Sequence, residues 1–153
     1  METECRDGRI DFQPLFGREV VGLFDGGNIS SDGGVMLLAE VERRTGMLGR
    51  LASCFEDHRD PDLIEHSVDD LLKQRIYGLC LGYEDLNDHD QLRSDPLLAA
   101  AVGKREPDGS DRAAARDRGK ALAGKSTLNR LELTPARAVP NLIVVAVVPE
   151  LGL

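Results

Sequence analysis

The sequence predicts a mainly α-helical fold with a small N-terminal β-hairpin, and three observations lead to this class. Aromatic residues make up only 4% of the 153 residues and Trp is absent, so a core has to come from Leu, Val, Ile and Ala. Several segments repeat apolar residues at three- and four-residue spacing, which is the period of an α-helix. Asp, Ser or Pro precede several of these segments and Gly follows them, as at capped helix ends. The length suits one domain with a core of its own.

The hairpin is predicted near residues 20–30. Val20–Phe24 is a run of apolar and β-branched residues, which predicts a strand that ends at Asp25. The glycines that follow allow a tight turn, so residues 28–30 can return as the second strand. Residues 1–19 are expected to form an irregular N-terminus.

Two helices are predicted after the hairpin. Over residues 33–44 the apolar positions follow helical spacing, and Gly46 is expected to be the C-cap. Ser31 or Asp32 is expected to accept from the free amides of the first turn. A second, short helix is expected over residues 47–55.

The strongest helical pattern starts at Leu63 or Ser67 and ends at Leu81. Asp69 and Asp70 then lie in the first turn, where they suit the positive end of the helix dipole. Because its apolar residues share one face, this helix is expected to be the centre of the core. The expected packing brings Leu71, Leu72, Ile76 and Leu79 against Leu37, Leu38 and Val41 of the earlier helix.

Two shorter helices and a linker are predicted in the second half of the chain. The first helix is expected to start at Asp85 or Asn87 and to end at Arg93. The second is expected over residues 96–102, with Asp95 as its cap. Residues 103–119 are rich in Gly, Pro, Asp and Arg and nearly lack large apolar groups. The expected organisation is a hairpin plus helical domain over 20–102, a linker or mobile loop over 103–119, a short helical segment over 120–137 and a poorly packed, divergent tail over 138–153.

Charge is distributed unevenly along the chain, whose net charge is −8. Residues 54–95 hold 12 acidic and 4 basic side chains, whereas residues 104–130 hold 8 basic and 4 acidic ones. Phosphate binding depends on the local density of Lys and Arg, so a DNA contact is predicted in the second segment, the alternative being a solvated linker. The predicted contact residues are Arg112, Arg116, Arg118, Lys120, Lys125 and Arg130. Such residues bind phosphates without reading the base sequence.

A second phosphate-binding pattern is present in the same segment. Residues 119–126 (GKALAGKS) match the phosphate-loop pattern G-x-x-x-x-G-K-[ST]. A phosphate loop follows a buried strand, but residues 110–118 are polar and have no strand character. A nucleotide-binding function is therefore an unfavoured alternative.

No set of residues in the sequence predicts a metal site. The Asp-rich residues 85–90 lack the Gly and the Glu of a calcium loop, and they predict a helix start instead. His58, His66 and His89 do not pair at helical spacing and are expected to be solvent-exposed or capping side chains. The cysteines have no C-x-x-C spacing, which fits free thiols in a cytoplasmic protein. No apolar run is long enough to span a membrane.

Three strings of residues carry a resemblance to a known family. They are residues 25–40 (DGGNISSDGGVMLLAE), 82–90 (GYEDLNDHD) and 122–132 (LAGKSTLNRLE). With these strings, about residues 18–137 resemble the amino-terminal region of bacterial insertion-sequence transposases of the DDE domain group 1 kind. The resemblance implies DNA transposition as the function and the ends of the insertion sequence as the DNA partner. In the full-length family it implies Mg²⁺ ions held by three carboxylates on an RNase H-like core.

The resemblance also implies what this chain lacks. The family continues into a long helix and a strand with the first catalytic Asp, whereas residues 138–153 contain no Asp and Glu150 as their one carboxylate side chain. The expectation is a truncated transposase fragment without the RNase H-like core, without catalytic or metal-binding residues and without a cofactor of its own. The alternative is a non-catalytic DNA-binding or protein-interaction module, which pairs with a full-length transposase or forms a homo-oligomer.

Overall fold

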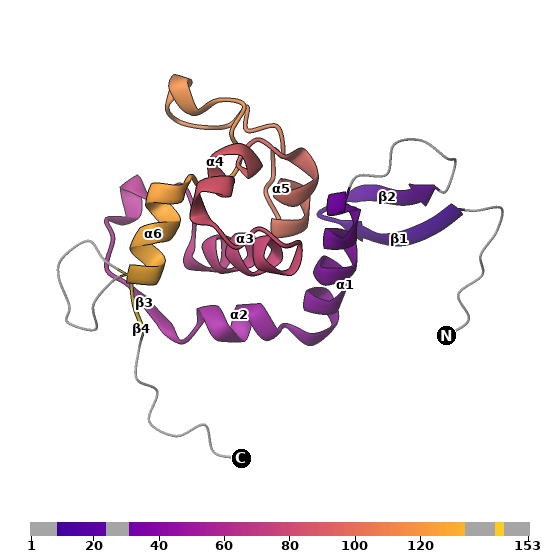
Figure 1. Ribbon diagram of the computed structural model, residues 1–153, viewed down its shortest axis with the longest axis horizontal. Helices are drawn as coiled ribbons and strands as arrows, with labels where there is room; N and C mark the ends of the chain where they lie inside the picture. Colours follow the sequence, from indigo (N-terminus) through magenta and orange to yellow (C-terminus); the bar gives the residue numbers. More distant parts are fainter. Residues whose placement is uncertain (1–8, 24–30, 134–142, 146–153) are drawn as a thin grey trace, which may run out of the picture.

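The computed structural model describes residues 9–23, 31–133 and 143–145. Of the six α-helices in this part of the chain, five gather around the sixth, α3 (Val68–Cys80) (Figure 1). The other five are α1 (Val35–Thr45), α2 (Met47–Ala52), α4 (His89–Leu92), α5 (Pro96–Val102) and α6 (Lys125–Leu133). Helices α2, α5 and α6 contact α3, and α1 packs against α5. The prediction of a mainly α fold with a small N-terminal hairpin is therefore confirmed.

The hairpin consists of β1 (Arg9–Leu15) and β2 (Arg18–Leu23), which pair antiparallel. Its turn is Phe16-Gly17, and both residues have positive φ (51° and 79°), as the right-handed twist of a two-residue hairpin requires. Strand β1 was not predicted, since residues 1–19 were expected to be irregular. The partner of β2 precedes it, because residues 9–15 alternate apolar and polar side chains as a half-buried strand does. Residues 28–30 lie outside the described part of the chain.

Helix α1 ends as predicted and begins differently. Gly46 is left-handed (φ 59°) and donates its N–H to the carbonyl of Glu42, which confirms the predicted C-cap. At the other end a 3₁₀ turn, η1 (Ser31–Gly34), leads into the helix, and no side chain caps Gly34. The carboxylate of Asp32, one of the two predicted caps, accepts from the Tyr83 hydroxyl at 3.0 Å.

Helix α2 is shorter than predicted because the chain becomes a strand directly after it. Residues Phe55–Asp57 form β3, which pairs antiparallel with β4 (Ile143–Val145). A three-residue strand has too little pattern of its own to be predicted, and its partner lies far along the sequence.

Helix α3 begins directly after Ser67, one of its two predicted starts. The Ser67 hydroxyl accepts from the Asp70 amide and the Asp70 carboxylate accepts from the Ser67 amide, each at 3.1 Å, which is a complete capping box. Helix α5 also has its predicted cap, because Asp95 accepts from the amides of Leu97 and Leu98. Helix α4 begins at His89 and has no side-chain cap.

The core has two parts, and α3 contributes to both. Tyr77 joins a larger cluster with α1, α4 and α5, while Val68, Leu71 and Leu72 join a smaller one with Leu128 of α6. Leu71 and Leu72 are buried as predicted, and Leu38 and Ile76 are partly buried.

The prediction of burial is wrong for three residues, because Leu37, Val41 and Leu79 are 62%, 52% and 44% exposed. Helix α1 buries Val35, Met36 and Ala39 instead. It is apolar over two adjoining faces, so the spacing alone could not choose between them.

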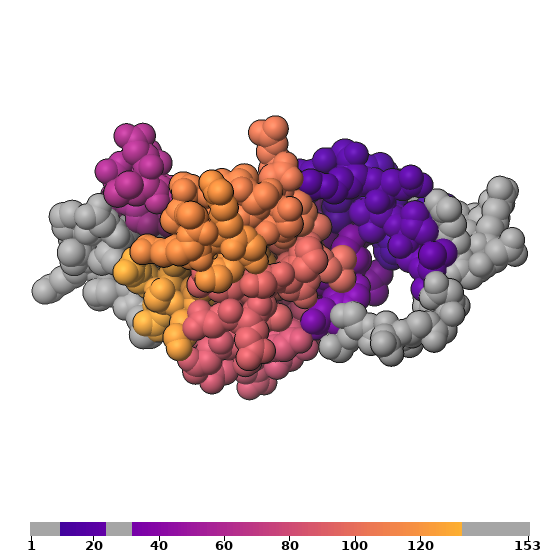
Figure 2. Space-filling view, turned by 90° about the horizontal axis from the view of Figure 1, so that it is seen from above, coloured from indigo at the N-terminus to yellow at the C-terminus, as the bar shows by residue number. Residues whose placement is uncertain are grey.

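Residues 103–119 cross the surface between α5 and α6 with one 3₁₀ turn, η4 (Ala115–Asp117). Figure 2 shows this orange segment spread over the middle of one face, beside the indigo hairpin. Its side chains pair with the helical body, as Lys104 does with Asp70 at 2.7 Å. The next residues, 121–123, are buried and join both clusters. The division of the chain into separate segments stays a prediction.

Candidate nucleic-acid interface

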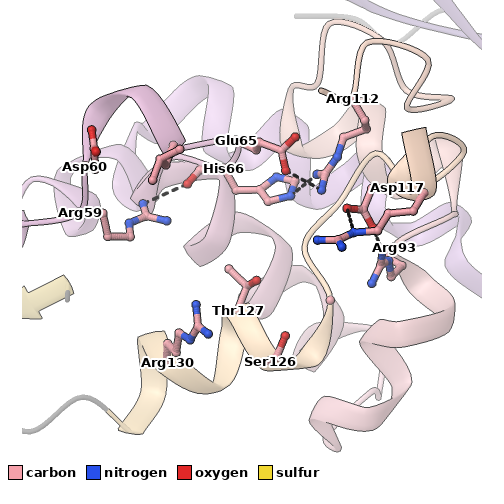
Figure 3. A pocket seen from close by; sticks show the side chains of 13 residues that line it. Arg59, Asp60, Glu65, His66, Arg93, Arg112, Asp117, Ser126, Thr127 and Arg130 are labelled. Carbon is pink, nitrogen blue, oxygen red and sulfur yellow. Dashed lines mark hydrogen bonds and ion pairs between the residues drawn. The ribbon is translucent and has the colours of Figure 1, made fainter. Parts of the chain in front are cut away.

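A pocket of about 600 Å³ opens between the segment around η2 (Pro61–Leu63), the end of α4, the 103–119 segment and the start of α6 (Figure 3). Its charged lining residues are of both signs, with arginines in excess. The arginines are Arg59, Arg93, Arg112, Arg116 and Arg130, and the carboxylates are Asp60, Glu65 and Asp117. The excess of guanidinium groups gives the pocket a positive lining.

The start of α6 completes the pocket. Ser126 and Thr127, in the first turn of this helix, line it with their hydroxyl groups. The carboxylate of Asp90 accepts from the Lys125 amide at 3.1 Å and so holds the first residue of α6 against α4.

Three of the arginines form ion pairs with lining carboxylates, and those of Arg93 and Arg112 are shorter than the 3.6 Å between Arg116 and Asp117. Only 11% of the Arg112 side chain is exposed, and its Nη2 lies 2.9 Å from Oε2 of Glu65. Arg93 donates to Asp117 at 3.0 Å. Burial raises the pKa of Asp117, but the charges of the surrounding arginines outweigh it and hold that pKa below its usual range. Asp117 therefore stays ionised and keeps Arg93 in place.

His66 is a buried member of the pocket wall. His66 is only 6% exposed. Its burial, together with the positive charges of Lys104 and Arg112, lowers the pKa of the imidazole to about 3. The imidazole is therefore neutral at neutral pH, and its Nε2 contacts Nη1 of Arg112. The expectation of solvent-exposed or capping histidines is wrong for His66 and His89, which are both buried, whereas His58 is exposed.

The predicted DNA-contact residues divide into two groups. The pocket brings together Arg112, Arg116 and Arg130. Lys120 donates to the backbone carbonyl of Arg116, Lys125 points to Asn87 and Asp90, and Arg118 is exposed outside the lining. The role of all six residues in DNA binding stays a prediction.

Four of the lining residues that were not predicted from the sequence are Arg59, Arg93, Ser126 and Thr127. Arg59 and Arg93 belong to the acidic segment over residues 54–95, where the local charge argued against an anion site. Ser126 and Thr127 were expected only as a helix cap. A basic site formed by separate segments of opposite net charge can be recognised only after the chain has folded.

The phosphate-loop pattern is engaged in internal hydrogen bonds. The amide of Leu122 donates to the carbonyl of Arg93 at 3.1 Å, and the amide of Ala123 donates to the side chain of Gln74 at 2.9 Å. The Lys125 ammonium donates to Asn87 at 3.0 Å. A phosphate cradle needs free amides and a free lysine, so this geometry argues against nucleotide binding at residues 119–126.

The comparison with protein families agrees with the resemblance. The model of the transposase DDE domain group 1 family matches residues 12–143. The match makes this protein a relative of the DDE transposases, and the chain belongs to the transposase DDE domain group 1 family. The matched region starts before residue 18 and ends after residue 137, the bounds of the resemblance seen in the sequence. It therefore includes much of the hairpin. No curated protein and no solved structure matches the chain.

The Mg²⁺ ions of this family require a cluster of carboxylate oxygens. Each carboxylate of the pocket is already held by a donor: Asp60 by the Asp62 amide, Glu65 by Arg112 and Asp117 by Arg93. Within the described ranges, no group of three His, Cys, Asp or Glu residues is placed to hold a metal ion. These residues therefore do not fit Mg²⁺. The helices in the same ranges also lack the length and apolar character needed to cross a bilayer.

Proposed function

We propose that this chain acts in DNA transposition by holding the phosphate backbone of insertion-sequence ends in the arginine-lined pocket. The observation that carries the proposal is that five arginines and the first turn of α6 line one pocket. Helix starts and clustered guanidinium groups are both common phosphate-binding features. The family match supports DNA as the partner.

The pocket arginines have complementary parts in this proposal. Arg116 has 88% of its side chain exposed and Arg130 is also exposed, so both can reach a DNA strand. Arg93 and Arg112 are fixed by their ion pairs, so they lose little freedom on binding. Contacts of this kind bind phosphates with little preference for base sequence.

We assign this role to a non-catalytic, amino-terminal part of a bacterial insertion-sequence transposase that acts in the cytoplasm. The support is that the carboxylates of the pocket are used to fix arginines and to cap a turn. Such groups position DNA and leave strand cleavage to other residues. Truncation of the protein, and pairing with a full-length transposase or a second copy, stay predictions from the sequence.

The test is DNA binding by the whole chain at low salt, measured by fluorescence anisotropy with a labelled duplex. Replacing both Arg116 and Arg130 with Ala removes two exposed charges from the pocket and is expected to weaken binding by roughly tenfold or more. Replacing Arg43 and Arg44 with Ala is the matched control, because these exposed arginines of α1 pair with Glu40 and lie outside the pocket lining. Equal losses in both double variants would contradict the proposal.

A further inference from the structure

Three buried nitrogen atoms of the pocket-lining residues have no hydrogen-bond partner in the described part of the chain. They are Nδ1 of His66, Nε of Arg93 and Nε of Arg112. Buried polar atoms without partners are rare in native proteins, and three among the residues of one pocket require a common explanation.

All three atoms are donors, and the contact between His66 and Arg112 establishes this for the imidazole. A guanidinium group has donors and no acceptor, so Nη1 of Arg112 must donate to Nε2 of His66. In a neutral ring the proton is then on Nδ1. His66 is neutral at neutral pH because burial lowers its pKa to about 3. Its Nδ1–H is thus a buried donor, like the two Nε–H groups.

The carboxylates that pair with the two arginines are already used. Glu65 pairs with Nη2 of Arg112, and Asp117 accepts from Nη2 of Arg93 (Figure 3). The first turn of the nine-residue α6 adds the hydroxyls of Ser126 and Thr127. A ligand that satisfies this set must bring several acceptor oxygens and negative charge.

We infer that the wall formed by His66, Arg93 and Arg112, together with the start of α6, binds the oxygens of one phosphate group. The inference rests on the proposed function, since that phosphate belongs to the DNA backbone. It goes further by assigning one phosphate to buried donors, apart from the exposed Arg116 and Arg130. A phosphodiester of DNA and a free phosphate ion present the same oxygen chemistry, so the test has an arm for each.

The experiment is a titration of the whole chain with inorganic phosphate at constant ionic strength, followed by NMR of the His66 imidazole nitrogens. The His66 signals are expected to show the Nδ1–H tautomer and a saturable shift with phosphate that chloride does not produce. Arg112→Lys keeps the positive charge but loses the Nε–H and the planar set of guanidinium donors. It is expected to weaken phosphate binding roughly tenfold. Arg43→Lys on α1 is the control and should leave it unchanged.

Ser126→Ala is a second variant that avoids the buried ion pair. Ser126 is exposed, so its loss should not affect folding, and phosphate binding should weaken by roughly threefold. A His66 signal that does not respond to phosphate, or responds equally to chloride, would overturn the inference.

A duplex DNA competitor separates this inference from the proposed function. If DNA displaces phosphate from the His66 site, both hold. If phosphate binds but DNA neither binds nor competes, the subsite stands for free phosphate and the proposed function fails. If DNA binds through Arg116 and Arg130 while His66 responds to neither ligand, the proposed function stands and the subsite is wrong.

Discussion

Helix α3 and the segment over residues 103–119 are held in place by different interactions. Helix α3 has a complete capping box and buries Leu71 and Leu72 in the core. The segment instead pairs charged side chains with distant residues, as Arg112 does with Glu65 and Asp117 with Arg93. The comparison shows that local sequence patterns determine the scaffold of this protein, whereas charge pairs between distant residues shape its pocket.

The largest expected effect is on the scaffold side of this comparison. Leu71 is fully buried in α3, so Leu71→Ala removes apolar contacts and leaves a cavity that should lower the free energy of unfolding by about 3 kcal/mol. Leu79→Ala, in the same helix but 44% exposed, is the control and should cost less than about 1 kcal/mol. Urea denaturation measures both. Equal losses would show that the core does not lie on the described face of α3.

The same pattern explains how much of the fold the sequence could predict. The capping box of α3, the Asp95 cap of α5 and the Gly46 C-cap depend on residues within one or two turns, and all three were predictable. The pairing of β3 with β4 and the convergence of Arg59 with Arg130 join residues far apart in sequence. No local pattern records such contacts, so they could not be predicted.

A smaller effect is expected where the scaffold meets the segment that leads to α6. The side chain of Gln74, which is 1% exposed, accepts from the Ala123 amide at 2.9 Å and donates to the Ala123 carbonyl at 2.8 Å. Gln74→Ala leaves both backbone groups buried and unpaired, so unfolding should become easier by about 2 kcal/mol. Thermal unfolding tests this, with the conservative Gln74→Asn as comparison. No change in stability would mean that this contact does not hold residues 121–124 on α3.

The pH dependence of stability is expected to show the effect of the pocket wall. The pKa of His66 lies near 3 in the folded chain, below its usual 6.5, and burial also lowers the pKa of His89. Between pH 6.5 and about 3, His66 of the unfolded chain binds a proton that His66 of the folded chain does not bind. Stability should therefore be complete above about pH 6.5 and fall with pH, by up to about 1.4 kcal/mol per pH unit for each histidine.

Denaturation at several pH values between 7 and about 4 measures this slope. His66→Gln should flatten it, because a group that does not titrate replaces the buried imidazole. His58→Gln is the matched control, since His58 is exposed and lies outside the pocket lining. A slope that is unchanged in the His66 variant would contradict the buried, neutral state of that side chain.

The most direct test of DNA holding by the arginine-lined pocket is the salt dependence of binding. The logarithm of the binding constant should fall linearly with the logarithm of the salt concentration, with a slope of about 0.9 for each phosphate contacted. With Arg116 and Arg130 replaced by Ala, the slope should be smaller by about 0.9 for each phosphate that the variant no longer neutralises. An unchanged slope and affinity in that double variant, with its fold confirmed by circular dichroism, would contradict the role of the pocket in holding DNA.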